Sequence, residues 1–271
     1  MDTPIPGHQN NSEEGEPGNI AGCPKSTHSR QCCITYTRVV DLSHVIHPGI
    51  PRWPGDPPVA FESVAELEKN GWYLRRFSMG EHSGTHLNAP NSFQAEGGSI
   101  DSYSAASLVV PAIVIDVRDR TSANLDYALP IAEVLAWEWR HGFVSAGSVV
   151  LLYTGWQAKW HDPAAFLGQD RDGGLHFPGF GADTARFLLD ERSIAGIGID
   201  TYGVDPGQDS TFAINRLLGG YGRSQRQQPR IVLENLANLD QLPPTGATLV
   251  IGILRLKGGA GSPVSVLAFV P

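Results

Sequence analysis

The sequence predicts a single β-rich α/β domain built around a mixed sheet. It has 271 residues, enough for one large buried core, and 41% of them are hydrophobic, which is the composition of a globular protein. Short, mostly continuous apolar runs recur along the chain, and such runs are typical of strands that are covered on both faces. Helical patterns are fewer, and long irregular connections separate the elements.

The predicted elements can be placed by residue. Each strand candidate is a short run in which apolar and β-branched side chains are frequent. The candidates are Val39–Leu42, Tyr73–Met79, Ala112–Val117, Ser148–Tyr153, Ile194–Ile199, Ile231–Leu233, Leu249–Leu254 and Ser265–Val270. Two helices are predicted: Pro130–Arg140, where a proline comes early, and Gly181–Glu191, which is amphipathic.

The first 36 residues differ from the rest. They are rich in Gly, Pro, Asn, Ser and Glu, and large apolar side chains are scarce before Ile34. Such a segment cannot bury enough surface to offset its ordering entropy, so we expect residues 1–36 to be a flexible extension and residues 37–271 to form the domain. The cysteines precede this core and fit no zinc-binding spacing, so we interpret them as free thiols; they are Cys23, Cys32 and Cys33.

Charge and hydropathy argue against several classes of partner. The formal net charge is −8 and no cluster of Lys and Arg is present, which disfavours nucleic acids and anionic membranes as partners. No apolar run is long enough to span a bilayer, and the first residues lack the pattern of a secretory signal. We therefore expect a cytoplasmic protein that acts on a small molecule.

A pair of histidines is the strongest sign of chemistry. His82 and His86 lie four residues apart, and Asn88 follows two residues later. Two imidazoles and an oxygen donor could bind one divalent ion if they converge within a few ångström. A straight strand would separate residues four apart by roughly 13 Å, and a glycine between them disfavours a helix. The spacing therefore predicts a bend at Ser83–Gly84, where glycine allows a positive φ.

This segment resembles the signature His-x-Gly-Thr-His-x-Asp-x-Pro-x-His of a cyclase family of metal-dependent hydrolases, which includes the bacterial kynurenine formamidases and the isatin hydrolases. Its fixed positions are occupied by His82, Gly84, Thr85, His86 and Pro90. Other matches follow in the family's order: Asp41-Leu42-Ser43, Pro54-Gly55-Asp56-Pro57, Thr154-Gly155-Trp156, Phe177-Pro178-Gly179, Gly198-Ile199-Asp200-Thr201, Glu234-Asn235-Leu236 and Gly261-Ser262-Pro263. The resemblance implies a domain of the swivelling β/β/α type that assembles as a homodimer or homotetramer.

Three positions depart from the family pattern. Asn88 stands where the family has a ligating Asp, Ser92 where it has the His that acts as general acid/base, and Asn215 where it often has a ligand His. Glu234, at another ligand position, is retained. A neutral amide is a poor bridge between two dications, so we expect at most one zinc or manganese ion. The predicted ligands are His82, His86, Asn88 and Glu234.

Candidate catalytic and binding residues follow from these matches. The catalytic candidates are His82, His86, Ser92, Glu234 and His176. Serine does not titrate near neutral pH and cannot replace an imidazole in proton transfer, whereas His176 is either a spare imidazole or an ordinary surface histidine. Predicted substrate contacts are Trp53, Trp156, Phe177 and Asn215, although the tryptophans could equally belong to the core.

Three functions are compatible with this pattern. The first is hydrolysis of a small cyclic amide, aryl formamide or lactone by metal-activated water. The second is a cyclase or dehydratase step on a polyketide-like substrate, for which His82 and His86 would position the substrate. The third is a catalytically silent homologue. The altered positions favour the last two, whereas the retained histidines and Glu234 argue against silence, and we expect the hydrolase.

Overall fold

The computed structural model describes residues 33–220 and 228–271. The predictions for residues 1–32, including most of the flexible extension and two of the cysteines, lie outside the described residues. One compact unit spans Ile34–Pro271. At its start the ring of Tyr36 packs edge-on against Phe269, with the ring centroids 4.7 Å apart, and Cys33 is a free, exposed thiol.

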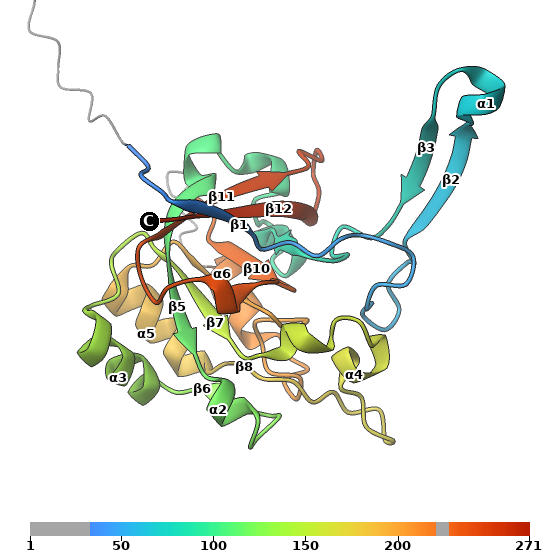
Figure 1. The fold of residues 1–271 in the computed structure, drawn as a ribbon. Coiled ribbons are helices and arrows are strands. Elements are labelled where there is room, and N and C mark those ends of the chain that lie inside the picture. The colour runs from blue at the N-terminus through green and yellow to red at the C-terminus, as the bar shows by residue number, and fades with distance from the viewer. Residues whose placement is uncertain (1–32, 221–227) are drawn as a thin grey trace, which may run out of the picture. The chain divides into compact units, whose positions relative to one another are not determined.

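A closed ring of seven strands lies at the centre of the fold (Figure 1). Hydrogen bonds run around it in the order β12–β11–β5–β7–β9–β10–β4 and back to β12. The pairs β5–β7, β7–β9 and β9–β10 are parallel and the other pairs are antiparallel, which confirms the predicted mixed sheet. The bounds are β4 His86–Asn88, β5 Val109–Asp116, β7 Val149–Tyr153, β9 Gly196–Ile199, β10 Ile231–Glu234, β11 Ala247–Ile253 and β12 Gly261–Val270.

Strand β12 closes the ring because two strands share one of its edges. Gly261–Pro263 pair with β4, whereas Leu267–Val270 pair with β1 (Arg38–Asp41), an eighth strand outside the ring. Strand β4 pairs with β10 on its other side. The short strand that begins with His86 is therefore held between two neighbours.

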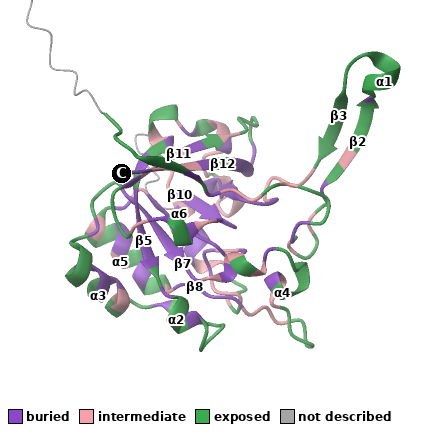
Figure 2. Cartoon of the chain, viewed as in Figure 1, coloured by how far each residue is buried: buried purple, intermediate pink, exposed green. Residues whose placement is uncertain are grey.

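Side chains from successive strand positions enter two separate cores. On β7, Val149 and Leu151 belong to a cluster made mostly of strand residues. The alternate residues Val150 and Leu152 belong to a second cluster, which includes residues of the helices α3 (Ile131–His141), α5 (Ala182–Arg192) and α6 (Ala213–Gly220). Because every residue of β7 is buried, its sequence is continuously apolar instead of alternating, and β7 is purple in Figure 2.

The eight predicted strands each overlap an observed strand, and the two predicted helices are α3 and α5. The sequence analysis did not predict β2 (Ala60–Ala65), β4 or α6. The remaining short elements are β6 Ala128–Leu129, β8 Gly179–Phe180, α1 Leu67–Asn70, α2 Arg118–Thr121, α4 Pro163–Leu167 and the 3-10 turns at Pro90–Ser92, Ile100–Ser102, Ala105–Leu108, Trp156–Lys159 and Leu239–Gln241. None of the helices in the described residues has the length and apolar character needed to cross a membrane.

A hairpin projects from the ring (Figure 1). It consists of β2, α1 and β3 (Leu74–Ser78), and we call residues 60–78 the arm. Its two strands form a sheet of their own, and all five residues of β3 are exposed. In Figure 2 most of the arm is coloured as exposed, in contrast to the ring.

Candidate active site

The site is built where β4 meets β10. These strands are antiparallel, and their register places His86 opposite Glu234. The His86 Nε2 and Glu234 Oε2 atoms are 3.1 Å apart, and both side chains are buried. Two residues far apart in the sequence are thus brought together by strand pairing alone.

Gly84 provides the bend that was predicted between the two histidines. Its φ is +64°, a conformation that glycine adopts without steric cost. The bend brings the imidazole rings of His82 and His86 to a centroid separation of 5.2 Å, at 81° to each other. The prediction that these two side chains converge is confirmed.

Hydrogen bonds define the orientation of both imidazoles. His86 Nδ1 lies 2.9 Å from the carbonyl oxygen of Gly84, and His82 Nδ1 lies 2.8 Å from Asn88 Oδ1. Both partners are acceptors, so each Nδ1 carries the proton. A neutral His82 then keeps a lone pair on Nε2, whereas His86 Nε2 faces the carboxylate of Glu234 and donates to it when the ring is charged. Burial, followed by the nearby charge of His86, lowers the pKa of His82, which favours its neutral form.

A chain of side-chain amides links the histidines to the carboxylates. Asn88 Nδ2 donates to Asn215 Oδ1 over 3.1 Å, and Asn215 Nδ2 donates to Glu234 Oε1 over 3.2 Å and to Asp205 Oδ2 over 2.9 Å. The backbone N–H of Val204 also donates to Glu234 Oε1. Every link in this chain pairs a donor with an acceptor.

The pKa values of the two buried carboxylates are shifted in opposite directions. Burial opposes ionisation of Glu234, but hydrogen bonding to His86, the charge of His86 and the Val204 N–H together lower its pKa. Burial raises the pKa of Asp205 to about 6, although hydrogen bonds from the backbone of Ile214 and from Asn215 oppose this shift. Both carboxylates are therefore mainly ionised at neutral pH, and Asp205 takes up a proton before Glu234 as the pH falls toward 6.

The donor atoms suit a single divalent ion better than a pair. Two ligands bound to one ion at about 2.0–2.2 Å lie roughly 3 Å apart, and the Nε2–Oε2 separation of 3.1 Å in the His86–Glu234 pair agrees with this. No group of three or more His, Cys, Asp or Glu side chains within residues 33–220 and 228–271 is arranged to hold a metal. His86 and Glu234 are thus the pair of strong donors whose separation suits one ion, and amide oxygens or water would have to complete its coordination.

Two adjoining cavities open onto these residues. The inner cavity, of about 180 Å³, contains the His86–Glu234 pair, Asn88, Asn215 and Asp205, and its aromatic wall consists of Trp53, Phe93, Phe177, Tyr202 and Phe212. The outer cavity, of about 430 Å³, lies under the segment 48–59. Both cavities are lined by Trp53, Asp56, His82 and Tyr202, so they meet at the more exposed histidine.

The predicted site residues therefore separate into two groups. His82, His86, Asn88, Glu234, Asn215, Trp53 and Phe177 all line the inner cavity. The other three do not line either cavity. Ser92 donates its hydroxyl proton to the carbonyl of Ala260; Trp156 is buried and donates from Nε1 to the carbonyl of Phe166; His176 contacts the carboxylates of Asp126 and Asp170.

Sequence reasoning missed several residues that line the inner cavity. They are Asp56, Phe93, Tyr202, Asp205, Asp209 and Phe212. Asp56 stands in the Pro54-Gly-Asp-Pro motif that matches the family, so that motif was a usable signal. Asp205 had none, because it reaches the site through its hydrogen bonds to the first residues of α6.

Residues 40–206 match the sequence model of the family described as "Putative cyclase". The isatin hydrolase of Roseibium aggregatum is 34% identical over 250 residues, covering 86% of this chain and 92% of that protein. This chain belongs to the cyclase family. The kynurenine formamidase of Bacillus cereus is 28% identical over 83% of this chain and 94% of its own length. The structure of isatin hydrolase A from Ralstonia solanacearum has a TM-score of 0.80 and 36% identity, covering 86% of this chain and 92% of that one.

Proposed function

We propose that this protein is a metal-dependent hydrolase that cleaves the carbon–nitrogen bond of a small cyclic amide or aryl formamide. The observation that carries the proposal is the buried His86–Glu234 pair, 3.1 Å apart, on the floor of a cavity with aromatic walls. Relatives that are named isatin hydrolase and kynurenine formamidase support the same class of reaction. A cytoplasmic location remains our prediction from the sequence.

The residues of the site suggest how such a substrate would be handled. A divalent ion, for which we propose zinc or manganese, would act as a Lewis acid on the carbonyl group and make water more acidic. His86 and Glu234 would hold the ion, and His82, whose ring centroid lies 5.2 Å from that of His86, is the third candidate ligand. Asn88 would fix the tautomer of His82, as outer-shell partners of metal-binding histidines usually do. The aromatic wall would bind the ring of the substrate and exclude bulk water.

The test compares Glu234→Gln with the native protein. Gln has the same shape and can still accept the hydrogen bonds from Val204 and Asn215, but it lacks the charge that a cation needs. Each protein would be stripped with a chelator and reloaded with zinc or manganese. Bound metal would then be measured together with the hydrolysis of isatin and N-formylkynurenine. We expect Glu234→Gln to lose most of the metal and at least about 10²-fold in turnover.

Glu191→Gln is the matched control, because Glu191 is an exposed residue of α5. It should behave as the native protein does. The proposal is wrong if the native protein hydrolyses neither substrate with either metal, or if the two variants retain equal activity.

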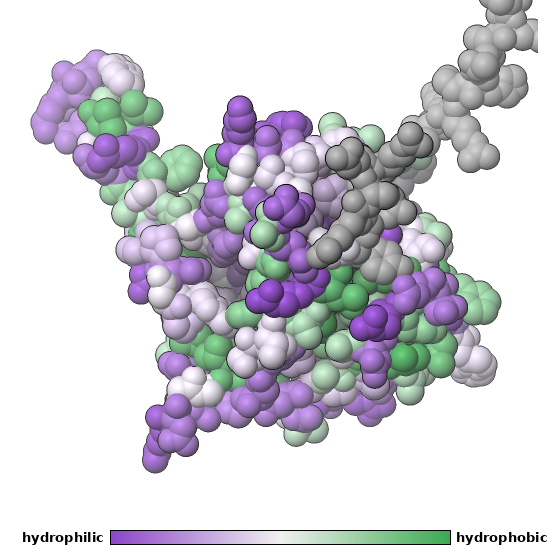
Figure 3. Space-filling model, turned by 180° about the vertical axis from the view of Figure 1, so that it is seen from behind, coloured by the Kyte–Doolittle hydropathy of each residue, from purple (hydrophilic) through white to green (hydrophobic). Residues whose placement is uncertain are grey.

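We also propose that the arm contacts a second copy of the chain. An isolated two-stranded hairpin is only marginally stable in water. The arm also exposes several large apolar side chains, which is typical of a surface that contacts a partner: Val64, Leu67, Trp72, Tyr73 and Phe77. Figure 3 shows hydrophobic side chains among hydrophilic ones on the arm, at the upper left. Glu62 lies on β2 opposite Arg76 on β3, so one arm carries both charges and can face an identical arm across a two-fold axis.

A further inference from the structure

The two buried carboxylates determine how the amide of Asn215 is oriented. Asn215 Nδ2 lies 2.9 Å from Asp205 Oδ2 and 3.2 Å from Glu234 Oε1. An ionised carboxylate can only accept hydrogen bonds, so the side-chain atom of Asn215 that faces both of them must be the nitrogen, and both of its hydrogens are used. Asn215 Oδ1 is therefore the atom that is directed at Asn88.

The same reasoning extends through Asn88 to His82. Asn215 Oδ1 can only accept, so Asn88 donates to it from Nδ2 over 3.1 Å. The other end of the Asn88 amide, Oδ1, then faces His82 Nδ1 at 2.8 Å and accepts from it. The imidazole proton is thus placed on Nδ1 by carboxylates that lie two amide side chains away. We call Asn88 and Asn215 the amide relay.

Both ends of the amide relay are anchored to the backbone. Gly261 on β12 pairs with Asn88, and a Cβ atom at Gly261 would lie 2.7 Å from His82 Cε1, so the imidazole already packs closely against this strand. At the other end, Asp205 accepts from the backbone N–H groups of Ile214 and Asn215 in the first turn of α6. The two amides between these ends are the groups that can turn over by rotation of a side-chain torsion.

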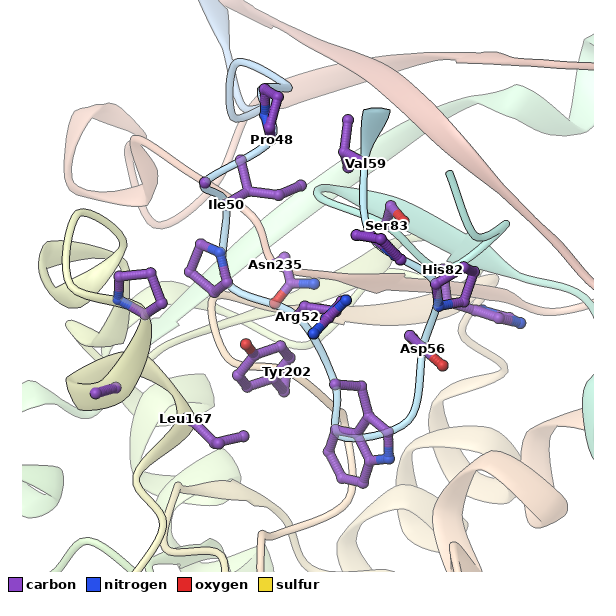
Figure 4. Close-up of a pocket in the computed structure, with 17 residues that line it drawn as sticks. Pro48, Ile50, Arg52, Asp56, Val59, His82, Ser83, Leu167, Tyr202 and Asn235 are labelled. Carbon is purple, nitrogen blue, oxygen red and sulfur yellow. The ribbon is translucent and has the colours of Figure 1, made fainter. Parts of the chain in front are cut away.

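We propose that Asn215 is a positioning residue for His82: it holds the Asn88 amide in the orientation that keeps the imidazole proton on Nδ1 and the lone pair on Nε2. His82 lines both cavities, and Figure 4 shows it with Asp56 on the wall of the outer one. A third metal ligand or a general base needs such a lone pair. The inference rests on the proposed hydrolase function for this catalytic consequence alone, because the hydrogen bonds belong to the chain itself.

Nitrogen NMR of the imidazole distinguishes the two tautomers in the metal-free protein. Spectra would be recorded at about pH 8, where imidazole is mainly neutral, and the His82 signals would be assigned by their loss in His82→Gln. Asn215→Leu has a similar size but cannot accept from Asn88. The ratio of the Nδ1–H to the Nε2–H tautomer of His82 should fall by roughly 2- to 10-fold, as expected for the loss of one hydrogen bond.

Asn215→Asp is the conservative variant. It still presents an oxygen to Asn88, so it should keep the native tautomer ratio, although it adds a third carboxyl group beside the two buried carboxylates. Asn124→Leu makes the apolar substitution at an exposed position that lines neither cavity, and it should also keep the native ratio. Thermal unfolding would show which variants are folded, and Asn215→Ala replaces Asn215→Leu if the latter does not fold.

The affinity for zinc supplies a second comparison. Asn215→Leu should bind zinc roughly 10-fold more weakly than the native protein, which is the usual size of an effect beyond the direct ligands, and Asn124→Leu should bind it normally. The inference is overturned if Asn215→Leu keeps the native tautomer ratio, or if Asn215→Asp loses it to the same extent. If the ratio depends on Asn215 but the native protein hydrolyses neither isatin nor N-formylkynurenine, the positioning role stands and the proposed function fails.

Discussion

His82 Nδ1 and Asn88 Oδ1 lie 2.8 Å apart, so the residue at position 88 sets the tautomer of the histidine. An amide oxygen performs this task without charge. A carboxylate at the same place would make the imidazole a stronger electron donor and would add a negative charge next to the ion.

Asn88→Asp should therefore bind zinc or manganese roughly 10- to 100-fold more tightly, which is the usual size of such outer-shell effects. Competition with a fluorescent chelator would measure the affinity. Asn124→Asp makes the same change of charge at an exposed position that lines neither cavity and should leave the affinity unaltered. An Asn88→Asp variant with native affinity would show that position 88 does not contribute to the metal site.

Acid should destabilise the protein through His44. Its ring stacks on Trp160 with a centroid separation of 3.8 Å, and burial together with the charge of His161 lowers its pKa from 6.5 to about 4. Below pH 6.5 the unfolded chain binds a proton at His44 more readily than the folded chain does. This contribution to stability is complete above pH 6.5 and is lost as the pH falls toward 4.

His44→Phe retains an aromatic ring against Trp160 but cannot be protonated. In urea unfolding at two pH values, about 7.5 and about 5, it should show a smaller difference in stability than the native protein. His141→Gln, at the exposed end of α3, should keep the native difference. Equal acid sensitivity in native protein and His44→Phe would assign the effect to other groups.

Gly196 is a glycine for a purely steric reason. A Cβ atom at this position of β9 would lie 2.0 Å from the carbonyl oxygen of Ile231 on β10, whereas a Cβ at Gly252 on β11 would lie 3.5 Å from its nearest atom. We expect Gly196→Ala to lower the free energy of unfolding by at least about 1 kcal/mol. Gly252→Ala should change it by less than about 0.5 kcal/mol. Denaturant midpoints measure both, and equal midpoints would contradict the prediction.

The arm should control the oligomeric state. If two copies associate through it, Trp72→Ser combined with Phe77→Ser should reduce the sedimenting mass to that of one 29.2 kDa chain, because both exposed aromatic side chains would leave the interface. Trp139→Ser removes a tryptophan that is 89% exposed on α3 and serves as the control. A native protein that already sediments as a single chain would rule out the proposed contact.

The sequence predicted the structure best where the pattern lies within one segment of the chain. Runs such as Ser148–Tyr153 predicted buried strands because both of their faces pack in cores, and Gly84 predicted the bend between the histidines. It predicted the structure least well where the conformation of a segment depends on residues in another part of the chain. The segment His86–Asn88 has no strand periodicity and becomes a strand only because β10 and β12 lie on either side of it.

Some side chains around the site were missed or wrongly assigned for the same reason. Asp205 and Phe212 were missed because nothing local connects them to the histidines, and the fold alone brings them to the cavity. Trp156 matches a family motif, yet its indole is directed into the core, where it bonds to the carbonyl of Phe166. A motif gives the identity of a residue, but the direction of its side chain depends on packing.

The pairing of β4 also has a consequence for the newly made chain. A ribosome delivers His86 well before Glu234, and β12, the other neighbour of β4, emerges later still. Until both strands have been synthesised, the histidine segment has no ladder to join, because every stabilising contact is non-local. The catalytic centre must therefore be among the last parts of the domain to mature. A nascent chain therefore carries His82 and His86 for most of translation before the strand that supplies Glu234 exists.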